Sequence, residues 1–421
     1  MKVLWFTNTP MPDVNKHFGK NAMGTGGWMG ALLELLKSRP ELHMGVVTAC
    51  SHYPQSSFQA DGVDYFIVKQ KSPRFRRSLF PLDNDPTYLH KCVDIVNTFK
   101  PDIVHIHGTE RFYAQMMSQG LIQCSVVISI QGIMDACSEW YRWFGKMPFK
   151  DILAVSALTS LKFSGLLLEW MEARQQATRE REYFRKGKYF FGRTEWDRAY
   201  LSYFNNNSRY FEVGEILRHP FWHQQWKLEE CKKHRLIFTN TRHPRKGTEL
   251  LLEAVKTLKP VYPDIELVLI GSLGHGGYAR YLQKKINEVG DIVKPLGQIT
   301  ADAIVKELCQ AHIFVSASYI DNSPNALAEA QLVGMPLISS YTGGVPSMVE
   351  EGKTGLFFPS GDVPLLVSRI KAIFDNDSLA RTLGENASQT ARKRHDPETI
   401  VKAQVAAYSN ILQDSNNQQN S

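Results

Sequence analysis

Short apolar runs, rich in β-branched and aromatic residues, alternate with longer helical patterns along the whole chain. In residues 1–215 these runs are Val3–Thr7, Gly45–Ala49, Tyr65–Val68, Ile103–His107, Val126–Ile130 and Tyr189–Gly192. In the remainder they are Leu236–Thr239, Glu266–Ile270, Ile292–Leu296, Ile313–Ser316, Pro336–Ser339 and Gly355–Phe358. Continuous apolar strands between helices are typical of parallel sheets covered on both faces. Two such series predict an α/β chain with two doubly wound, Rossmann-like domains.

The chain changes character near residues 215–233, where an aromatic stretch is followed by a polar, charged one before the strand at Leu236. We therefore expect an N-terminal domain over 1–215 and a C-terminal domain over 216–397. The last helical pattern, 398–412, could pack back on the N-terminal domain, and the polar residues 413–421 are expected to be a disordered tail. A length of 421 residues suits this division.

Composition narrows the class of partner. Hydrophobic residues make up 43% and charged residues 22%, so the chain can bury a core and is not disordered over most of its length. The net charge is +7, and residues 1–200 hold 25 basic against 19 acidic residues. This excess favours an acidic ligand or a membrane surface, but it is too mild for a dedicated nucleic-acid binder.

The cysteines and the apolar segments indicate where the protein resides. None of the six cysteines forms a CxxC pair or a zinc-like spacing with histidine, which favours reduced, buried thiols and no metal site. Met1–Thr7 is too short for a secretory h-region, and Ile152–Met171 is interrupted by Lys162 and Glu169. We expect a cytoplasmic protein, at most peripheral on the inner face of the membrane.

The most informative motif is Asp321–Gly334, which follows the strand at 313–316. Ser323 is a plausible N-cap and Pro324 fits the first helical position, so a helix would begin at the carboxyl edge of a parallel strand. Amides at such an N-terminus favour an anion, most naturally a diphosphate. The free N–H groups that we expect at this helix start are those of Asn325, Ala326 and Leu327.

Two carboxylates flank this helix start. Asp321 precedes the helix, and Glu329 lies about a turn and a half inside it. Carboxylates accept hydrogen bonds from sugar hydroxyls, so the two side chains could bind two parts of one ligand. The alternative is a capped surface helix with two solvated acids.

A second basic motif follows the strand at 236–239. Arg242, Arg245 and Lys246 crowd a loop that opens the amphipathic helix 248–258. Cations beside a helix N-terminus form a phosphate clamp. The alternative is a solvated basic turn, but both motifs lie at carboxyl ends of strands in one domain, where open α/β sheets bind ligands.

The N-terminal half offers two weaker signals. The glycine-rich stretch 24–30 lies sixteen residues after the first strand, too far for a dinucleotide fingerprint, so Gly26 and Gly27 are expected to present backbone amides to a phosphate or sugar. His105 and His107 alternate on one strand and therefore share a face. We expect His105 to be structural, and His107 with Glu110 to face a ligand.

The second half of the chain resembles the family-four retaining glycosyltransferases, the glycosyl transferases group 1. The resemblance is carried by SASYIDNSPNALAEAQLVGMPLISSYTGGVPSMVEEGKTGLFFPSGD (316–362), TRHPRKGTELLLEA (241–254), ELVLIGS (266–272) and VKPLGQIT (293–300). KVLWFT, GTGGW and PDIVHIHG resemble it more loosely in the first half. The resemblance implies the GT-B fold: two facing Rossmann-like domains, with a nucleotide-sugar donor on the C-terminal domain, the acceptor on the N-terminal domain and an interdomain cleft.

The resemblance also implies roles for individual residues. Glu329 would bind the donor ribose, Asp321 the transferred sugar, and Arg242 with Lys246 the diphosphate. The backbone positions that it assigns to donor or acceptor binding are Gly26, Gly27, Gly297, Asn325, Ala326 and Leu327, with Gly343 and Gly344 shaping the site. His107, Glu110 and Gln131 would lie on the acceptor or sugar side.

Two positions depart from the family pattern. Asp321 stands where relatives have glutamate and is one methylene shorter. Gln131 stands where relatives usually have histidine, so that this position can donate and accept hydrogen bonds but cannot titrate. The departures leave the identity of the donor sugar open.

The implied function is retaining transfer of a sugar from a UDP- or GDP-linked donor to a hydroxyl of a glycan or lipid-linked acceptor in surface polysaccharide synthesis. No metal or other cofactor is expected, because the cations and the helix N-terminus would stabilise the diphosphate. Ser72–Phe80 and Lys162–Lys188 could rest on an anionic membrane surface. The alternatives are a non-catalytic carbohydrate- or partner-binding protein on a degenerate scaffold, and a GT-B nucleotide-sugar epimerase.

Overall fold

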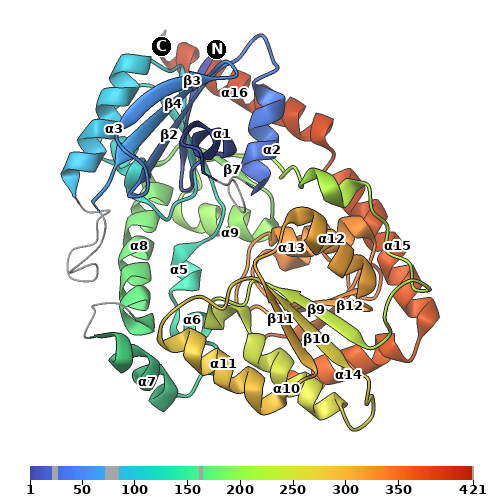
Figure 1. The fold of residues 1–421 in the computed structure, drawn as a ribbon. Helices are drawn as coiled ribbons and strands as arrows, with labels where there is room; N and C mark the ends of the chain where they lie inside the picture. The colour runs from blue at the N-terminus through green and yellow to red at the C-terminus, as the bar shows by residue number, and fades with distance from the viewer. Residues whose placement is uncertain (21–26, 72–84, 161–164, 420–421) are drawn as a thin grey trace. The chain divides into compact units, whose positions relative to one another are not determined.

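The computed structural model describes residues 1–20, 27–71, 85–160 and 165–419, which form two compact units (Figure 1). Unit 1 comprises Met1–Asp135, Glu172–Ile216 and His395–Ser421, and unit 2 comprises Ala136–Met171 and Leu217–Arg394. This division differs from the expected domains of 1–215 and 216–397 because the segment 136–171 packs within unit 2. Sequence patterns locate strands and helices, but they do not show on which sheet a helical insertion packs.

Unit 1 is built on a sheet whose described strands run in the order β3-β4-β2-β1-β5-β6-β7-β8. The strands are β1 Lys2–Thr7, β2 His43–Cys50, β3 Ser56–Ala60, β4 Val63–Lys69, β5 Ile103–His107, β6 Ser125–Ser129, β7 Tyr189–Gly192 and β8 Arg209–Glu212. All pairings are parallel except that of β3 with β4. The six predicted runs correspond to the inner strands of the sheet, β1, β2, β4, β5, β6 and β7, whereas the edge strands β3 and β8 were not predicted. These two edge strands have no buried residue, so they lack the apolar run by which buried strands are found.

The helices of unit 1 cover this sheet and close its core. They are α1 Pro12–His17, α2 Gly27–Leu36, α3 Pro86–Phe99, α4 Gln115–Ser118, α9 Glu195–Phe204 and α16 Pro397–Gln419, with most of α8 Leu166–Lys186 and the start of α5 Met134–Cys137. The last helix, α16, lies beside the blue strands and α2 in Figure 1. Tyr408 of α16 accepts a hydrogen bond from Trp5 Nε1 at 3.0 Å. The helix continues through Gln419, so the expectation of a disordered tail was wrong for residues 413–419. Asp414 pairs with Arg209, and Ser415 Oγ lies 2.5 Å from Ser125 Oγ, so side chains of β8 and β6 hold this last part of the helix.

Unit 2 contains a second sheet, all parallel, in the order β11-β10-β9-β12-β13-β14. Its described strands are β9 Arg235–Thr239, β10 Glu266–Ile270, β11 Val293–Gly297, β12 Ile313–Ser316, β13 Leu337–Tyr341 and β14 Leu356–Pro359. Every one was predicted to within about two residues at each end. The prediction of α/β architecture is confirmed for both units.

The helices of unit 2 include two from the inserted segment. They are α6 Trp140–Phe144, α7 Phe149–Ser160, α10 Thr248–Leu258, α11 Gly277–Val289, α12 Ala301–Gln310, α13 Asn325–Val333, α14 Val363–Phe374 and α15 Asp377–Arg394. Helix α7 crosses the start of α11 so closely that a Cβ on Gly277 would lie 2.1 Å from the carbonyl oxygen of Val155. Within the described ranges, no helix is long and apolar enough to cross a membrane.

Candidate functional site

The predicted ligand loops follow β9 and β12, which are neighbours in the sheet of unit 2. From β9 the chain continues to β10 on one side, and from β12 it continues to β13 on the other. The strand order therefore reverses between β9 and β12. In open α/β sheets, ligands bind outside the carboxyl ends of the strands at such a reversal point.

The two loops contact each other at this point. The Tyr319 amide donates to the Arg245 carbonyl at 2.7 Å. Gly247 has φ +70°, and a Cβ there would lie 2.1 Å from the Ala317 carbonyl oxygen. Glycine is thus required at the start of α10, and the basic loop is held against the loop that carries Asp321.

The predicted diphosphate cation and the predicted sugar acid are joined. Lys246 Nζ lies 2.5 Å from Asp321 Oδ2, and the two side chains are 12% and 18% exposed. Ser318 Oγ donates to the same carboxylate oxygen at 3.1 Å. Lys246 and Asp321 were expected to contact different parts of a ligand, and the structure shows that each can also satisfy the other.

Glu329 is buried on α13 and is held by an arginine that the sequence reasoning missed. Arg218 Nε donates to Glu329 Oε1 at 2.6 Å, and Arg218 Nη2 donates to Oε2 at 2.7 Å. Burial raises the pKa of Glu329, and the Arg218 guanidinium opposes that shift. Each carboxylate oxygen has two lone pairs, so Glu329 can accept a further hydroxyl hydrogen bond. Arg218 lies 111 residues away, in the stretch 215–233 that was interpreted only as the domain boundary, so no local pattern indicated it.

The paired glycines pack against the Asp321 loop. The Gly344 amide donates to the Asp321 carbonyl at 3.1 Å. Gly343 has φ +51°, and a Cβ there would lie 2.0 Å from that same oxygen. A side chain at position 343 would therefore displace the backbone of Asp321.

Helix α13 begins one residue later than predicted, with Pro324 as its N-cap in place of Ser323. The Leu327 amide donates to the Pro324 carbonyl at 3.0 Å. The expectation that Leu327 offers an unengaged amide was therefore wrong, because the first turn closes with an i→i−3 bond. Asn325 and Ala326 lie at the start of the helix, as predicted.

Two further predicted residues flank this region. Arg242 is exposed, with its Cγ 3.2 Å from the position that a Cβ on Gly274 would occupy. Gly297 ends β11 with φ +67°, and its carbonyl accepts from the Gly271 amide at 2.8 Å. Strand β11 lies two strands from β9, so Gly297 is at the same sheet edge but away from the reversal point.

His243 shapes the basic loop and was not singled out from the sequence. Its Nδ1 accepts from the Arg245 amide at 3.1 Å, and its ring meets Trp143 of α6 edge-on at 4.5 Å. Burial, together with the charges of Arg245, Lys246 and Arg242, holds the pKa of His243 well below its usual value. A neutral imidazole therefore fixes the turn that presents the cations.

In unit 1, His107 is completely buried, and the expectation that it faces a ligand was wrong. Its ring lies 4.4 Å from Trp5, 5.8 Å from Trp28 and 3.9 Å from His105. Burial, reinforced by the charge of Arg193, lowers the pKa of His107 to about 3. The strand pattern showed correctly that both histidines share a face, but not that aromatic rings and α16 cover that face.

His105 is structural, as predicted. Its Nε2 is 2.7 Å from Ser129 Oγ, and its Nδ1 is 2.6 Å from Tyr408 Oη. It joins β5 to β6 and to α16.

The other residues predicted for the acceptor or sugar side lie at the ends of β5 and β6. Glu110 accepts from Asn8 Nδ2 at 2.8 Å, and Gln131 Nε2 is 3.6 Å from the Met29 sulfur. Gly27 begins α2 with φ +42°. Gly26 lies outside the described residues.

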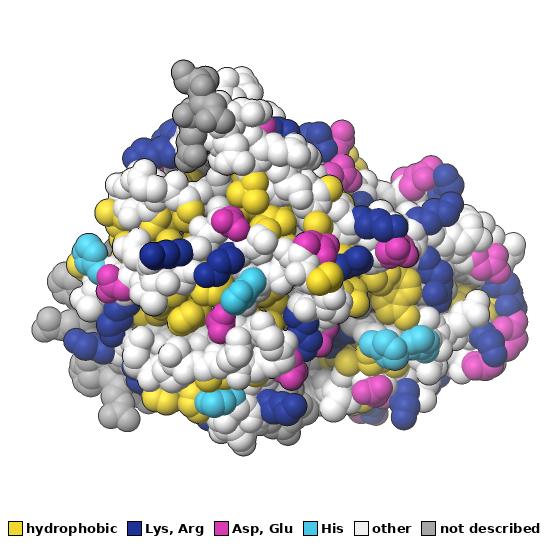
Figure 2. Space-filling model, turned by 90° about the horizontal axis from the view of Figure 1, so that it is seen from above, with side chains coloured by type: hydrophobic (Ala, Val, Ile, Leu, Met, Phe, Trp, Pro, Cys, Tyr) yellow, Lys and Arg dark blue, Asp and Glu magenta, His cyan; other side chains and the backbone are white. Residues whose placement is uncertain are grey.

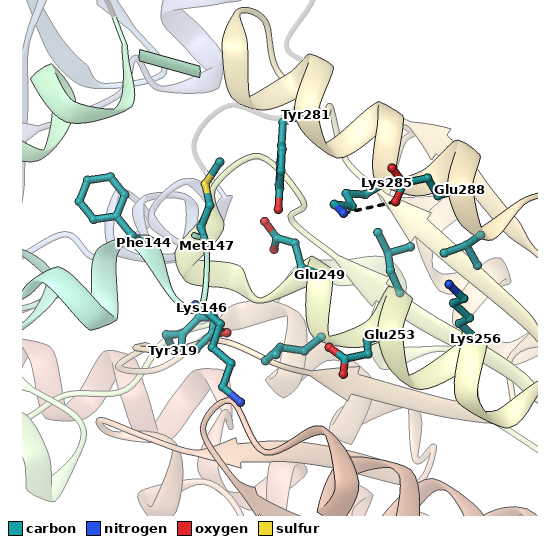
Figure 3. Close-up of a pocket in the computed structure, with 13 residues that line it drawn as sticks. Phe144, Lys146, Met147, Glu249, Glu253, Lys256, Tyr281, Lys285, Glu288 and Tyr319 are labelled. Carbon is teal, nitrogen blue, oxygen red and sulfur yellow. Dashed lines mark hydrogen bonds and ion pairs between the residues drawn. The ribbon is translucent and has the colours of Figure 1, made fainter. Parts of the chain in front are cut away.

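A cavity of about 290 Å³ lies in unit 2 between α10, α11 and the segment after α6 (Figure 3). In Figure 3 the Glu249 carboxylate and the Tyr281 hydroxyl point toward each other. Tyr278 Oη donates to Glu249 at 3.0 Å, and burial raises the pKa of Glu249 to about 7. The cavity shares no lining residue with the predicted site.

Two further properties of the described residues are their capacity to bind a metal ion and the distribution of their charges. Among the residues that the structure describes, no group of three or more His, Cys, Asp or Glu side chains is arranged to hold a metal ion. On the face shown in Figure 2, basic and acidic side chains are interspersed. The excess positive charge therefore does not form one large patch on that face.

Comparison with known proteins identifies the second half. Residues 220–390 match the family Glycosyl transferases group 1. A curated relative, the GDP-mannose-dependent monoacylated alpha-(1-6)-phosphatidylinositol monomannoside mannosyltransferase of Corynebacterium glutamicum, is 28% identical over 148 residues, which cover 34% of this chain and 38% of that protein. The matched segments span about a third to a half of the length of the first curated relatives.

Solved structures show the fold over the whole chain. Sucrose-phosphate synthase from Thermosynechococcus elongatus has a TM-score of 0.72 at 16% identity and covers 98% of this chain and 100% of that chain. HepE from Anabaena, in complex with UDP-glucose, has a TM-score of 0.66 at 15% identity and covers 97% and 100%. The chain has the GT-B fold, as predicted.

Proposed function

We propose that this chain, whose residues 220–390 form a Glycosyl transferases group 1 domain, transfers a sugar from a nucleotide-diphosphate sugar to an acceptor hydroxyl with retention of configuration. The observation that carries the proposal is the meeting of the basic loop after β9 with the start of α13 at the reversal point of the sheet. Lys246 and Asp321 stand together there, where a diphosphate and its sugar would bind.

Donor binding would proceed by exchange of partners. A diphosphate carries more negative charge than one carboxylate, so it would take Lys246 from Asp321, with Arg242 and the first amides of α13 as further donors. The released Asp321 carboxylate could then accept a sugar hydroxyl. Glu329, held by Arg218, would accept a ribose hydroxyl.

The chemical step would form and break bonds on one face of the sugar. The bond from C1 to the β-phosphate oxygen breaks, its electron pair leaves with the diphosphate, and the acceptor oxygen bonds to C1. The acceptor proton passes to the departing diphosphate, so no protein base is required. Lys246, Arg242 and the helix start would stabilise the developing charge. His107 is not suited to be a base, because it is buried.

We propose that no metal takes part, since the cations of the basic loop would stabilise the leaving group. Turnover of the donor should then be unchanged by excess EDTA. A loss of turnover that Mg²⁺ or Mn²⁺ restores would contradict this part of the proposal.

The proposed acceptor is a glycan or a lipid-linked hydroxyl used in surface polysaccharide synthesis, as the resemblance implies. The relative from Corynebacterium glutamicum is named for a phosphatidylinositol mannoside, an acceptor on a lipid. A transferase that uses such a lipid-linked acceptor would act on the inner face of a membrane.

The structure suggests a surface for that contact in the inserted segment of unit 2. Trp140, Phe149, Leu153 and Met171 are 40%, 61%, 44% and 44% exposed. The Trp140 and Phe149 rings lie 6.1 Å apart. Aromatic and aliphatic side chains of this kind insert at membrane interfaces. Ser72–Phe80 and Lys162–Ser164 of the expected basic surface lie outside the described residues.

The donor proposal is tested by adding UDP, GDP and a panel of UDP- and GDP-sugars to the full chain and measuring its thermal unfolding. One nucleotide class should raise the midpoint, and its sugar should be hydrolysed slowly without acceptor. No shift and no hydrolysis with any of them would refute the proposal.

Sedimentation with vesicles with and without anionic lipid, comparing the wild type with Phe149→Ser, tests the membrane contact.

A further inference from the structure

Glu180 is a fully buried carboxylate that the proposed donor chemistry does not use. It lies on α8 in unit 1 and has no exposed surface. Glutamate is rarely buried in this way unless it has partners, because an ionised carboxylate loses its hydration. Its hydrogen bonds should therefore show why it is there.

Three donors from two loops converge on this side chain. The Met134 amide donates to Oε1 at 3.0 Å, and the Asp135 amide donates to Oε2 at 2.8 Å. The Thr109 hydroxyl also donates to Oε1. Thr109 lies in the loop after β5, and Met134 and Asp135 begin α5, directly after the loop that follows β6, so one carboxyl group joins the two loops.

The same two loops carry the residues predicted for the acceptor or sugar side. Glu110 follows Thr109 directly, and Gln131 lies three residues before Met134. The loops lie side by side, since a Cβ on Gly132 would be 3.9 Å from Glu110 Oε1. The next residue of α8, Arg181, adds a second hold, with its Nε 2.6 Å from Asp135 Oδ1.

We propose that Glu180 is a positioning residue, whose buried carboxyl group ties the loop after β5 to the loop after β6 and thereby places Glu110 and Gln131 for the sugar-transfer step. The inference rests on the proposed function for its catalytic consequence. Its structural consequence, the coupling of the two loops, is independent of any substrate. Displacement of positioning groups by about 1 Å can cost a transferase on the order of 100-fold in rate.

The test replaces Glu180 by glutamine, which has the same shape but places an NH₂ group before one of the three donors. Both oxygens of a carboxyl group can accept a hydrogen bond, even when one is protonated, whereas the NH₂ group cannot accept one. Hydrogen exchange of the full chain should become faster in peptides covering 107–113 and 130–137. Peptides covering 241–250 and 318–330 should not change. The matched control is Glu182→Gln on the same helix, an exposed residue paired with Lys186, which should exchange like the wild type.

A second pair of variants keeps the test informative if Glu180→Gln does not fold. Thr109→Val removes one donor to the carboxylate, and Thr109→Ser retains the hydroxyl. Faster exchange in the 130–137 peptide for the valine variant alone would show that the coupling passes through Glu180. Equal exchange in the valine variant and the wild type would overturn the coupling.

The functional readout separates positioning from general damage. With the nucleotide sugar that the wild type hydrolyses, Glu180→Gln should lower kcat about 10-fold. The dissociation constant for the matching nucleoside diphosphate, UDP or GDP, should stay within about twofold, because the diphosphate residues are in unit 2. An unchanged kcat, or an equal loss of nucleotide affinity, would overturn the positioning role.

The two hypotheses fail in different ways. If the wild type hydrolyses no UDP- or GDP-sugar, the proposed function is wrong, and the catalytic role of Glu180 falls with it. Hydrogen exchange in the two loops would still show whether Glu180 couples them.

Discussion

The two units hold the charged residues of their candidate sites in opposite ways. In unit 2, Lys246 with Asp321 and Arg218 with Glu329 form ion pairs with some access to water. In unit 1, His107 and Glu180 have no exposed surface, and burial pushes each toward its neutral form. The comparison suggests that unit 2 is arranged to exchange charged partners with a ligand, whereas unit 1 uses polar groups to fix backbone shape.

The largest effect that this contrast predicts is that of Lys246→Ala. Loss of the cation should lower kcat for donor hydrolysis on the order of 100-fold, because developing diphosphate charge would lose a preorganised partner. Kinetics with the accepted nucleotide sugar would measure this. Lys259→Ala, an exposed lysine at the far end of α10, is the matched control and should lose little. Equal losses in both variants would contradict the assignment of Lys246.

The second test removes the partner of Glu329. Arg218→Ala should lower the free energy of unfolding by about 3 kcal/mol, because it leaves a buried carboxylate without its cation. Arg369→Ala is a matched control: Arg369 and Arg218 side chains are both 33% exposed, but the partner of Arg369, Glu351, is 46% exposed. The control should lose about 1 kcal/mol or less in urea unfolding. Similar losses would mean that burial of Glu329 does not matter.

The third test concerns pH and unit 1. Burial raises the pKa of Glu180 to about 8, above the ordinary glutamate value of 4.5. Between these two pH values the folded state holds a proton that the unfolded state has released. The contribution of Glu180 to the free energy of unfolding is therefore fully present below pH 4.5 and is lost as the pH rises toward 8. Urea unfolding from pH 5 to pH 8 should show a decline of up to about 1 kcal/mol per pH unit from this group. The Glu180→Gln variant should lack this part of the decline with pH. An equal decline in the variant and the wild type would contradict the assignment to Glu180.

The smallest expected effect is the sharpest test of partner exchange. Asp321→Ala frees Lys246 from its ion pair, so UDP or GDP should bind about threefold more tightly, while hydrolysis of the nucleotide sugar falls. Titration calorimetry with the nucleoside diphosphate would measure the gain. Weaker binding of the diphosphate would show that Asp321 assists the diphosphate and does not compete with it.

Much of unit 2 could be read from the sequence. All its strands and helix α10 follow from local periodicity, and the basic and acidic loops could be brought together because parallel strands end at one edge of a sheet. Unit 1 was harder, since β3 and β8 are edge strands without an apolar run and the segment 136–171 packs elsewhere. The start of α13 shows the usual limit, an error of one residue at a helix end.

The sequence by itself determined the two α/β series, the family resemblance and the residue types at the strand ends, because these depend on neighbours along the chain. Only the tertiary structure decided which charges meet. Lys246 and Asp321 are 75 residues apart, and Glu329 is 111 residues from Arg218. The burial of His107 and the hold of Glu180 on two loops likewise depend on packing between distant segments, which no local pattern specifies.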